Sequence, residues 1–293
     1  MMSRLGIAMM WLLHFLPLRG LRWLGIGLGL LLYAFVCGRR RVVITNFKIC
    51  FPQWSRQQNR QCARQHFIYF AQAWLDRSWL WFGTPELISQ RVELKGAQEL
   101  IQNIQPTVVF APHFVGLDVG WTALCMHLKQ PMRTIYTPQA NAVVDAWITK
   151  GRQRFGDVHL FLRKKGAQAI VSQLRNNGLL YLLPDMNYAQ DESIFVPFYG
   201  VMAATVPSLS RFAKLGKAQV VPVVSRMTNR GYVVQVLPAW INYPTDDVLA
   251  DTQLMNERLQ TWIDDMPAQY FWVHQRFKSR PEGDPSLYGG KRL

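Results

Sequence analysis

The chain has 293 residues, of which 49% are apolar, so it is long enough for one large domain or two small ones with a sizeable core. Its formal net charge of +15 indicates an anionic partner: nucleic acid, phospholipid headgroups, a phosphorylated substrate or an acidic protein. The sequence lacks zinc-finger spacing, an RNP-like block and a basic low-complexity tail, which argues against nucleic acid. Eleven Trp residues and an apolar N-terminus favour a membrane surface instead.

The first 41 residues predict a membrane anchor. Residues 5–16 are apolar and end at Pro17, and residues 23–37 form a second apolar run. The second run falls short of the roughly 20 residues that cross a bilayer straight, so the segment either spans with a kink or lies as two pieces in the interface. Arg39–Arg41 stand where a secretory signal would have a cleavage site, and they predict that residues 42–293 form a cytoplasm-facing domain. A buried helical hairpin in a soluble protein is the alternative.

The remaining chain predicts an α/β fold, a mixed sheet flanked by helices. Residues 42–82 read as helical, with a basic stripe at Arg56, Arg60 and Arg64 that is either a solvated face or a contact to headgroups. From about residue 90, apolar runs alternate with helical periodicity. We expect strands at 107–111, 133–136, 158–162, 179–183, 218–224 and 231–237, and helices at 117–128, 139–151, 166–177, 207–215 and 252–264.

The most informative motif is a histidine at the end of a buried strand, followed by an aspartate five residues later. His113 comes directly after the strand 107–111, and Asp118 comes at the start of the next helix. With His113 in the loop and Asp118 in the first helical turn, the carboxylate would hold one ring nitrogen and leave the other free as a base. Such a base suits proton removal from a hydroxyl that attacks an activated acyl group. A structural hydrogen-bonded pair is the plainer reading.

Three further blocks supply candidate binding residues. Arg163 lies between a strand and a helix start, where a cation is well placed for phosphate, although a basic surface loop looks the same. Asp185 follows the run 179–183, where α/β sheets place functional groups and where a plain turn is equally at home. Residues 194–200 read as an apolar, aromatic loop that ends at Gly200, with Thr205 shortly after. We expect it to line an acyl-chain channel or to cap the core.

Other chemistries have little support in the sequence. It contains no Walker loop, dinucleotide-binding glycine motif, nucleophile elbow or H-E-x-x-H motif. The remaining histidines have no metal-ligand spacing, and the four cysteines form no C-x-x-C pair. We therefore expect no metal, no cofactor and no disulfide framework, which fits a reducing compartment.

Taken together, the blocks resemble a known family. The His113/Asp118 block is similar to the signature of glycerolipid-type acyltransferases, and the whole chain resembles the late acyltransferases of lipid A biosynthesis, the lauroyl/myristoyl transferases of Gram-negative bacteria. One departure is Asn187, where that family commonly has a second acidic residue. The blocks that carry the resemblance are Arg39–Arg41, residues 46–52, His113 with Asp118, Arg163 with Gly166, Pro184-Asp185, residues 195–200 with Thr205, and the tail 270–282.

The resemblance implies a glycerolipid acyltransferase-like core and O-acyl transfer in lipopolysaccharide biosynthesis. The donor would be acyl-carrier protein, and the acceptor a hydroxyl of a lipid A precursor such as Kdo-lipid A. His113 would be the general base, Asp118 its orienting partner and Arg163 the phosphate contact; Asp185, Gly200 and Thr205 would help to bind substrate. We expect membrane phospholipid to be a further partner, nucleic acid not to be one, and the location to be the inner membrane, with the catalytic domain on the cytoplasmic side. Another acceptor, such as a lysophospholipid or aminolipid, and a catalytically silent membrane-binding protein are the alternatives.

Overall fold

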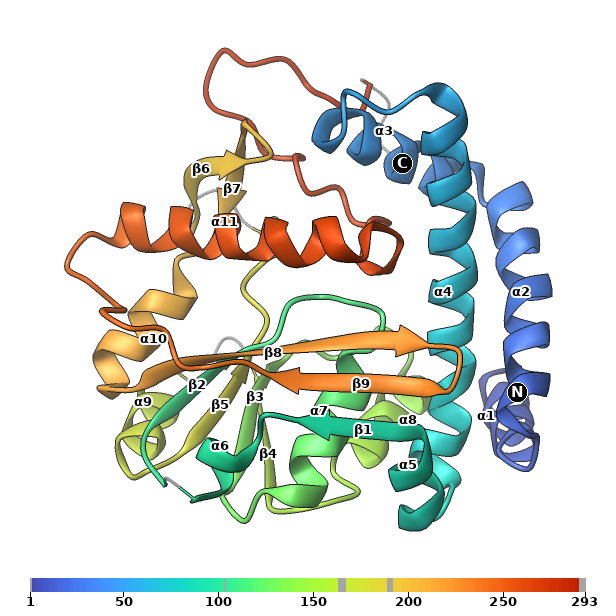
Figure 1. Cartoon of the computed structure of the whole chain (residues 1–293), viewed down its shortest axis with the longest axis horizontal. Helices are drawn as coiled ribbons and strands as arrows, with labels where there is room; N and C mark the ends of the chain where they lie inside the picture. Colours follow the sequence, from blue (N-terminus) through green and yellow to red (C-terminus); the bar gives the residue numbers. More distant parts are fainter. Residues whose placement is uncertain (1, 103, 163–166, 189–191, 290–293) are drawn as a thin grey trace.

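A seven-stranded sheet forms the centre of the protein. The computed structural model describes residues 2–102, 104–162, 167–188 and 192–289. The strand order is β1-β9-β8-β2-β5-β3-β4, and every pair is parallel except β8–β9 (Figure 1). The predicted mixed α/β fold is confirmed. The strands are β1 (Val92–Lys95), β2 (Thr107–Phe110), β3 (Met132–Tyr136), β4 (Val158–Leu162), β5 (Leu179–Leu182), β8 (Gln219–Thr228) and β9 (Gly231–Val236).

Helices cover both faces of this sheet. Alternate residues of the central strand β2 enter two separate cores: Val109 packs into one and Val108 and Phe110 into the other. The first core also contains α5 (Pro85–Arg91), α7 (Leu117–His127) and α8 (Ala142–Arg152). The second contains α9 (Ala167–Arg175), α10 (Ser208–Gly216) and α11 (Val248–Asp265). Because both faces are buried, the central strands are continuous apolar runs, which is why the sequence predicted them well.

Four N-terminal helices stand along one side of the sheet (Figure 1). They are α1 (Met2–Leu13), α2 (Leu18–Phe35), α3 (Cys37–Cys50) and α4 (Arg56–Phe82). The helical stretch predicted at 42–82 is therefore two helices, separated around Pro52. The predicted anchor, residues 1–41, comprises α1, α2 and the start of α3.

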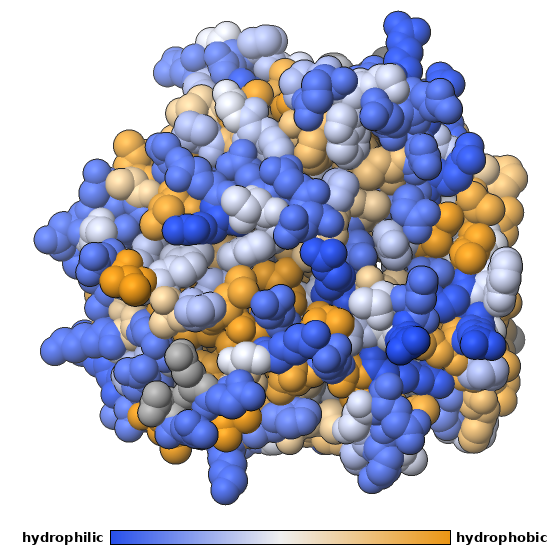
Figure 2. Space-filling model, viewed as in Figure 1, coloured by the Kyte–Doolittle hydropathy of each residue, from blue (hydrophilic) through white to orange (hydrophobic). Residues whose placement is uncertain are grey.

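The helix α2 is long and apolar enough to cross a membrane, and one of its faces is packed against α4. A side chain at Gly29 would place its Cβ 2.5 Å from the Cα of Ile68, so only glycine permits this close approach. Arg22 of α2 also pairs with buried Asp76 of α4 at 2.6 Å. The opposite face leaves large apolar side chains exposed, among them Trp23 and Phe35. Apolar side chains gather along the right edge of the surface, where α1 and α2 lie (Figure 2).

The aromatic segment predicted as a loop is a β-hairpin. Strands β6 (Ile194–Phe198) and β7 (Val201–Thr205) pair in antiparallel fashion, and Gly200 has a φ of +73° in their tight turn. The structure also contains three short elements that the sequence did not predict: α5, β1 and α6 (Gln98–Gln102). Strand β1 is an edge strand of only four residues with alternating burial, a pattern too short to stand out from a loop.

After α11, the described residues 270–289 form an irregular tail that lies near α3. After α11, a short 3-10 helix (Pro267–Gln269) leads into Tyr270, which forms an antiparallel bridge with Phe114. Asn46 of α3 donates to the carbonyl oxygens of Trp272 and His274 at 2.8 and 2.9 Å. The tail is therefore held on one side by the loop that follows β2 and on the other by α3.

Candidate active site

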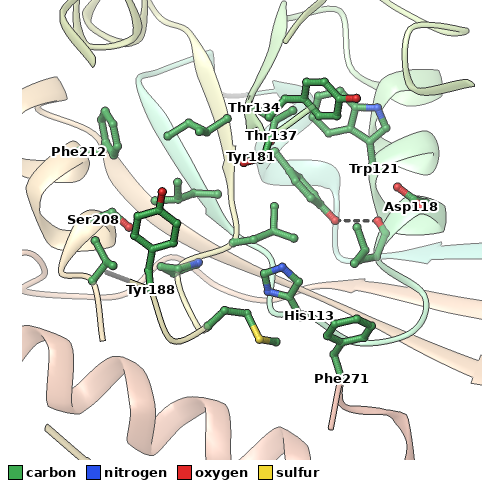
Figure 3. A pocket seen from close by; sticks show the side chains of 18 of the residues that line it. His113, Asp118, Trp121, Thr134, Thr137, Tyr181, Tyr188, Ser208, Phe212 and Phe271 are labelled. Carbon is green, nitrogen blue, oxygen red and sulfur yellow. Dashed lines mark hydrogen bonds between the residues drawn. The ribbon is translucent and has the colours of Figure 1, made fainter. Parts of the chain in front are cut away.

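A cavity of about 600 Å³ opens beyond the carboxyl ends of β2, β3 and β5. In Figure 3, His113 lies at its floor, Trp121 and Asp118 lie toward one end, and Ser208 and Phe212 of α10 lie at the other. This edge is where parallel α/β sheets place ligand sites, because the loops after adjacent strands meet there. The volume is in the range of small-molecule sites.

His113 is held by Asp185, which leaves β5 beside the end of β2. The ring Nδ1 lies 2.8 Å from Oδ1 of Asp185, and the His113 backbone N–H donates to Oδ2 at 2.9 Å. Strands β2 and β5 pair in parallel, with Phe110 opposite Leu182, so the two loops leave the sheet side by side. With Nδ1–H donating to the carboxylate, Nε2 remains available to a substrate in the cavity.

Asp185 is completely buried, and its environment keeps it ionised. Burial raises the pKa of its carboxyl, but the opposing charge of His113 and the hydrogen bonds from the His113 ring and backbone outweigh burial and lower that pKa below its ordinary value. A buried carboxylate against one imidazole fixes the orientation and the tautomer of the ring. This is the arrangement that a general base needs when it takes up a proton.

Asp118 is also buried in the wall of this cavity, but two arginines hold it. Its Oδ2 accepts from Nε of Arg77 at 2.9 Å, and its Oδ1 accepts from Nε of Arg152 at 3.0 Å. Burial raises the pKa of Asp118, yet Arg152 and Arg77 lower it to about 2. Arg77 is in turn packed over the rings of Trp74 and Trp81. One carboxylate between two guanidinium groups leaves this cluster with a net charge of +1.

The predicted contact between His113 and Asp118 is therefore corrected: the carboxylate on the ring is Asp185. Asp118 does lie in the first turn of α7, as the spacing predicted. However, the segment from His113 to Gly116 intervenes, and the bridge from Phe114 to Tyr270 fixes its course. The ring of His113 is directed to the end of β5, whereas Asp118 is directed to α4 and α8.

Of the other predicted binding residues, the structure places Gly200 and Thr205 away from this cavity. Arg163 lies outside the described residues. Gly200 lies in the β6–β7 turn, and Thr205 is buried, where it accepts from Arg276 of the tail at 2.6 Å. Neither Gly200 nor Thr205 is among the described lining residues. Asn187, next to the Asp185 loop, accepts from the backbone N–H of Ser279 at 3.1 Å, so its amide braces the tail.

The tail supplies site residues that the sequence did not predict individually, because residues 270–282 entered only through the resemblance to a family. The Phe271 N–H donates to the His113 carbonyl at 2.9 Å, and the Phe271 ring lines the cavity. The Tyr270 hydroxyl donates to the Asp185 carbonyl at 3.2 Å. The tail thus contacts both members of the His113–Asp185 pair, although Tyr270 follows Asp185 by 85 residues in the chain. Only the aromatic character of this block hinted at such a packing role.

No group of three or more potential ligands among the described residues is arranged to hold a metal ion. The chemistry that the described side chains offer is acid–base. One imidazole is poised by a buried carboxylate, and Arg152 is the arginine in the described lining. Apolar walls complete the cavity, among them Ile135, Leu182 and Phe212.

Comparisons with known proteins agree on one family. Residues 1–279 match the model for bacterial lipid A biosynthesis acyltransferases. The lipid A biosynthesis lauroyltransferase of Escherichia coli (strain K12) is 31% identical over 291 residues, which is 97% of this chain and 94% of that protein. The palmitoleoyltransferase of the same strain is 29% identical, over 97% of this chain and 93% of that protein.

A solved structure is more distant. The crystal structure of the 1-acyl-sn-glycerophosphate acyltransferase from Thermotoga maritima has a TM-score of 0.40 and 12% identity over 85% of this chain and 98% of that chain. This likeness is too low to support an inference. The resemblance read from the motifs is confirmed by the family match and by the full-length relatives. The chain belongs to the bacterial lipid A biosynthesis acyltransferase family and is an acyltransferase.

Proposed function

We propose that this protein transfers a fatty acyl chain from acyl-carrier protein to a hydroxyl of a lipid A precursor, with His113 as general base. The observation that carries the proposal is the hydrogen bond between His113 and buried Asp185 at the floor of a partly apolar cavity. The family supplies the acceptor class, since the relatives are lipid A biosynthesis acyltransferases. We expect the acceptor group to be the 3-hydroxyl of an acyl chain already present on the glucosamine disaccharide.

In the reaction, one proton passes from the acceptor hydroxyl to the His113 imidazole and then to the leaving thiolate. The acceptor oxygen attacks the thioester carbonyl carbon while Nε2 of His113 takes the hydroxyl proton. The tetrahedral intermediate collapses with cleavage of the C–S bond, and the leaving thiolate takes the proton back from Nε2. The products are an ester and a free thiol, and His113 returns to its neutral form. Asp185 stabilises the imidazolium that forms between these steps, so no covalent acyl-enzyme is required.

Arg152 joins Arg163 as a candidate for contacting the acceptor phosphate. It lines the cavity, and the Arg77–Asp118–Arg152 cluster carries a net positive charge. Asp118 would then act by fixing Arg152 rather than by orienting His113. Arg163 stays a prediction from the sequence. Replacing either arginine by Ala should raise the KM for the acceptor and spare the KM for the donor. A charge-assisted contact is worth roughly 1.5–3 kcal/mol, so kcat/KM for the acceptor should fall about ten- to a hundredfold.

We also propose that residues 1–41 anchor the protein in the inner membrane and that residues 42–293 face the cytoplasm. The exposed apolar faces of α1 and α2 support this placement. So does the charge distribution, because the first 75 residues contain ten Arg and Lys residues and no Asp or Glu. Anionic headgroups attract such a segment, and positive flanking residues favour the cytoplasmic side.

Acyl transfer is tested with purified protein in detergent, a lipid A precursor and a set of acyl-carrier-protein donors, with products identified by mass. Lysophospholipid and aminolipid acceptors are run in parallel. We expect acylation of the lipid A precursor. Preferential acylation of one of the other lipids would replace the acceptor, and no acylation of any lipid by folded protein would leave a membrane-binding role.

Membrane attachment is tested by fractionation. We expect the protein to remain with the inner membrane after a high-salt wash and the catalytic domain to resist protease added from the periplasmic side. Recovery of full-length protein in the soluble fraction without detergent, or digestion from the periplasmic side, would contradict the placement.

A further inference from the structure

The helix α10 carries cations on its outer surface and cavity-lining residues on an adjoining edge. Arg211, Lys214 and Lys217 are exposed along the helix and just beyond it, and Leu215 among them has 53% of its surface exposed. Arg175 of α9 is exposed next to them and donates to the Leu215 carbonyl at 2.8 Å. An apolar centre with a charged rim is the usual composition of a protein-binding patch.

The same helix forms one end of the cavity. Ser208 and Phe212 lie at the end opposite Asp118 and Trp121, with His113 between the two ends (Figure 3). A partner bound to the outer surface of α10 would therefore sit beside the cavity that holds the general base. The segment from residue 193 to residue 245 contains no Asp or Glu, and Lys214 of α10 pairs with Asp246 just after it.

This patch is far from the cations that accompany the apolar helices. In Figure 1, α9 and α10 lie at the left edge of the molecule, and α1 and α2 lie at the right edge. Polar side chains predominate on the left edge of the surface and apolar ones on the right (Figure 2). With the apolar helices on a membrane, the α10 patch would remain accessible to a soluble partner.

We propose that the surface of α10 formed by Arg211, Lys214, Leu215 and Lys217, with Arg175 of α9, docks the acidic carrier protein that delivers the acyl thioester. The inference rests on the proposed function, which supplies the donor. The thioester arm would enter the cavity past Phe212 and present its carbonyl carbon to the acceptor hydroxyl at His113. Charge complementarity of this kind raises the association rate and weakens with added salt.

The test is charge reversal at two exposed positions, Arg211→Glu with Lys217→Glu, against a matched control, Arg230→Glu with Arg258→Glu. The control residues are also exposed and lie on the β8–β9 turn and on α11. The change in net charge is the same in both variants. Binding of acyl-carrier protein is measured without acceptor, and KM and kcat are measured for both substrates, each at low and high salt.

We expect the α10 variant to weaken carrier-protein binding and raise the donor KM by about tenfold or more at low salt, with the difference shrinking at high salt. The acceptor KM and turnover of a small acyl-pantetheine thioester should match those of wild type, and the control should behave as wild type. A raised acceptor KM with an unchanged donor KM would show that the patch binds lipid A phosphates instead. Equal effects in the two variants, or none in either, would also overturn the docking site.

The proposed function fails in a different way. If wild-type protein does not bind acyl-carrier protein and does not use it as a donor, the donor assignment is wrong whatever the variants do. If wild type uses the carrier protein and the α10 variant is unaffected, the donor stands and only the docking surface is wrong.

Discussion

Asp185 and Asp118 are two buried carboxylates beside the same cavity, but they have opposite partners. Asp185 receives the ring and backbone N–H groups of His113, whereas Asp118 lies between Arg77 and Arg152. The pKa of each is lowered, the first by an imidazole whose charge changes during a proton transfer and the second by two permanent cations. A carboxylate facing an imidazole can tune a base, whereas one facing two guanidinium groups can only hold them in place.

We expect the largest effect from replacing His113, the proposed general base. His113→Ala should lower kcat by about 10²–10⁴-fold with substrate binding preserved, because a hydroxyl attacks a thioester slowly while it keeps its proton. His127→Ala is the matched control, since His127 is exposed on α7 and its ring bonds the Ala123 carbonyl of the same helix. Rates are measured by steady-state acyl transfer. Near-normal turnover by folded His113→Ala protein would remove His113 from the mechanism.

Asp185→Asn should come next, with a loss of about 10²-fold or more in kcat. The neutral amide neither stabilises an imidazolium nor enforces the Nδ1–H tautomer. Because the two residues act as one unit, the double variant with His113→Ala should be little worse than His113→Ala alone. Losses that multiply in the double variant would show that Asp185 and His113 act independently.

Asp118→Asn should affect stability more than turnover. Its pKa of about 2 lies below the ordinary value of 3.8, so ionised Asp118 stabilises the fold by roughly 2–3 kcal/mol above pH 4. That contribution is lost as the pH falls from about 4 to about 2. We expect the variant to have a lower free energy of unfolding in urea at pH 7 and the gap to wild type to narrow below pH 4.

The kinetic comparison of the two Asp variants is the sharpest test of this assignment. We expect Asp118→Asn to lower kcat by less than Asp185→Asn, with its larger effect on the acceptor KM through Arg152. If Asp118→Asn keeps a stable fold and lowers kcat more than Asp185→Asn does, Asp118 is the orienting carboxylate that the five-residue spacing suggested.

The smallest effect should come from the tail. Tyr270→Phe removes the hydroxyl that donates to the Asp185 carbonyl, and such a hydrogen bond is worth about 1 kcal/mol. If all of this energy serves to position Asp185 in the transition state, kcat should fall roughly fivefold with KM unchanged. Tyr288→Phe is the control, because the Tyr288 hydroxyl accepts from the Phe277 N–H, away from His113. Equal kcat losses in both variants would mean that Tyr270 acts through general tail stability and not by positioning Asp185.

The sequence by itself determined the order of the main elements and the position of His113. Six of the seven strands of the described sheet and five helices were predicted within a few residues. The central strands, buried on both faces, are apolar runs, and surface helices keep their periodicity. His113 at the end of β2 follows from the same local pattern. The edge strand β1 was missed because four residues with alternating burial carry little signal. The hairpin β6–β7 was missed because Pro197 and the turn at Gly200 interrupt its apolar run.

Only the tertiary structure decided which carboxylate meets His113. Asp118 is five residues away in sequence and Asp185 is 72 away, yet the parallel pairing of β2 with β5 brings the distant residue into contact. Strand order depends on how distant elements connect and pack, and no local pattern encodes it. The pairing of Asp118 with Arg77 and Arg152, and the contact of Tyr270 with the Asp185 loop, depend on the same long-range packing, so they too lay beyond what the sequence alone could predict.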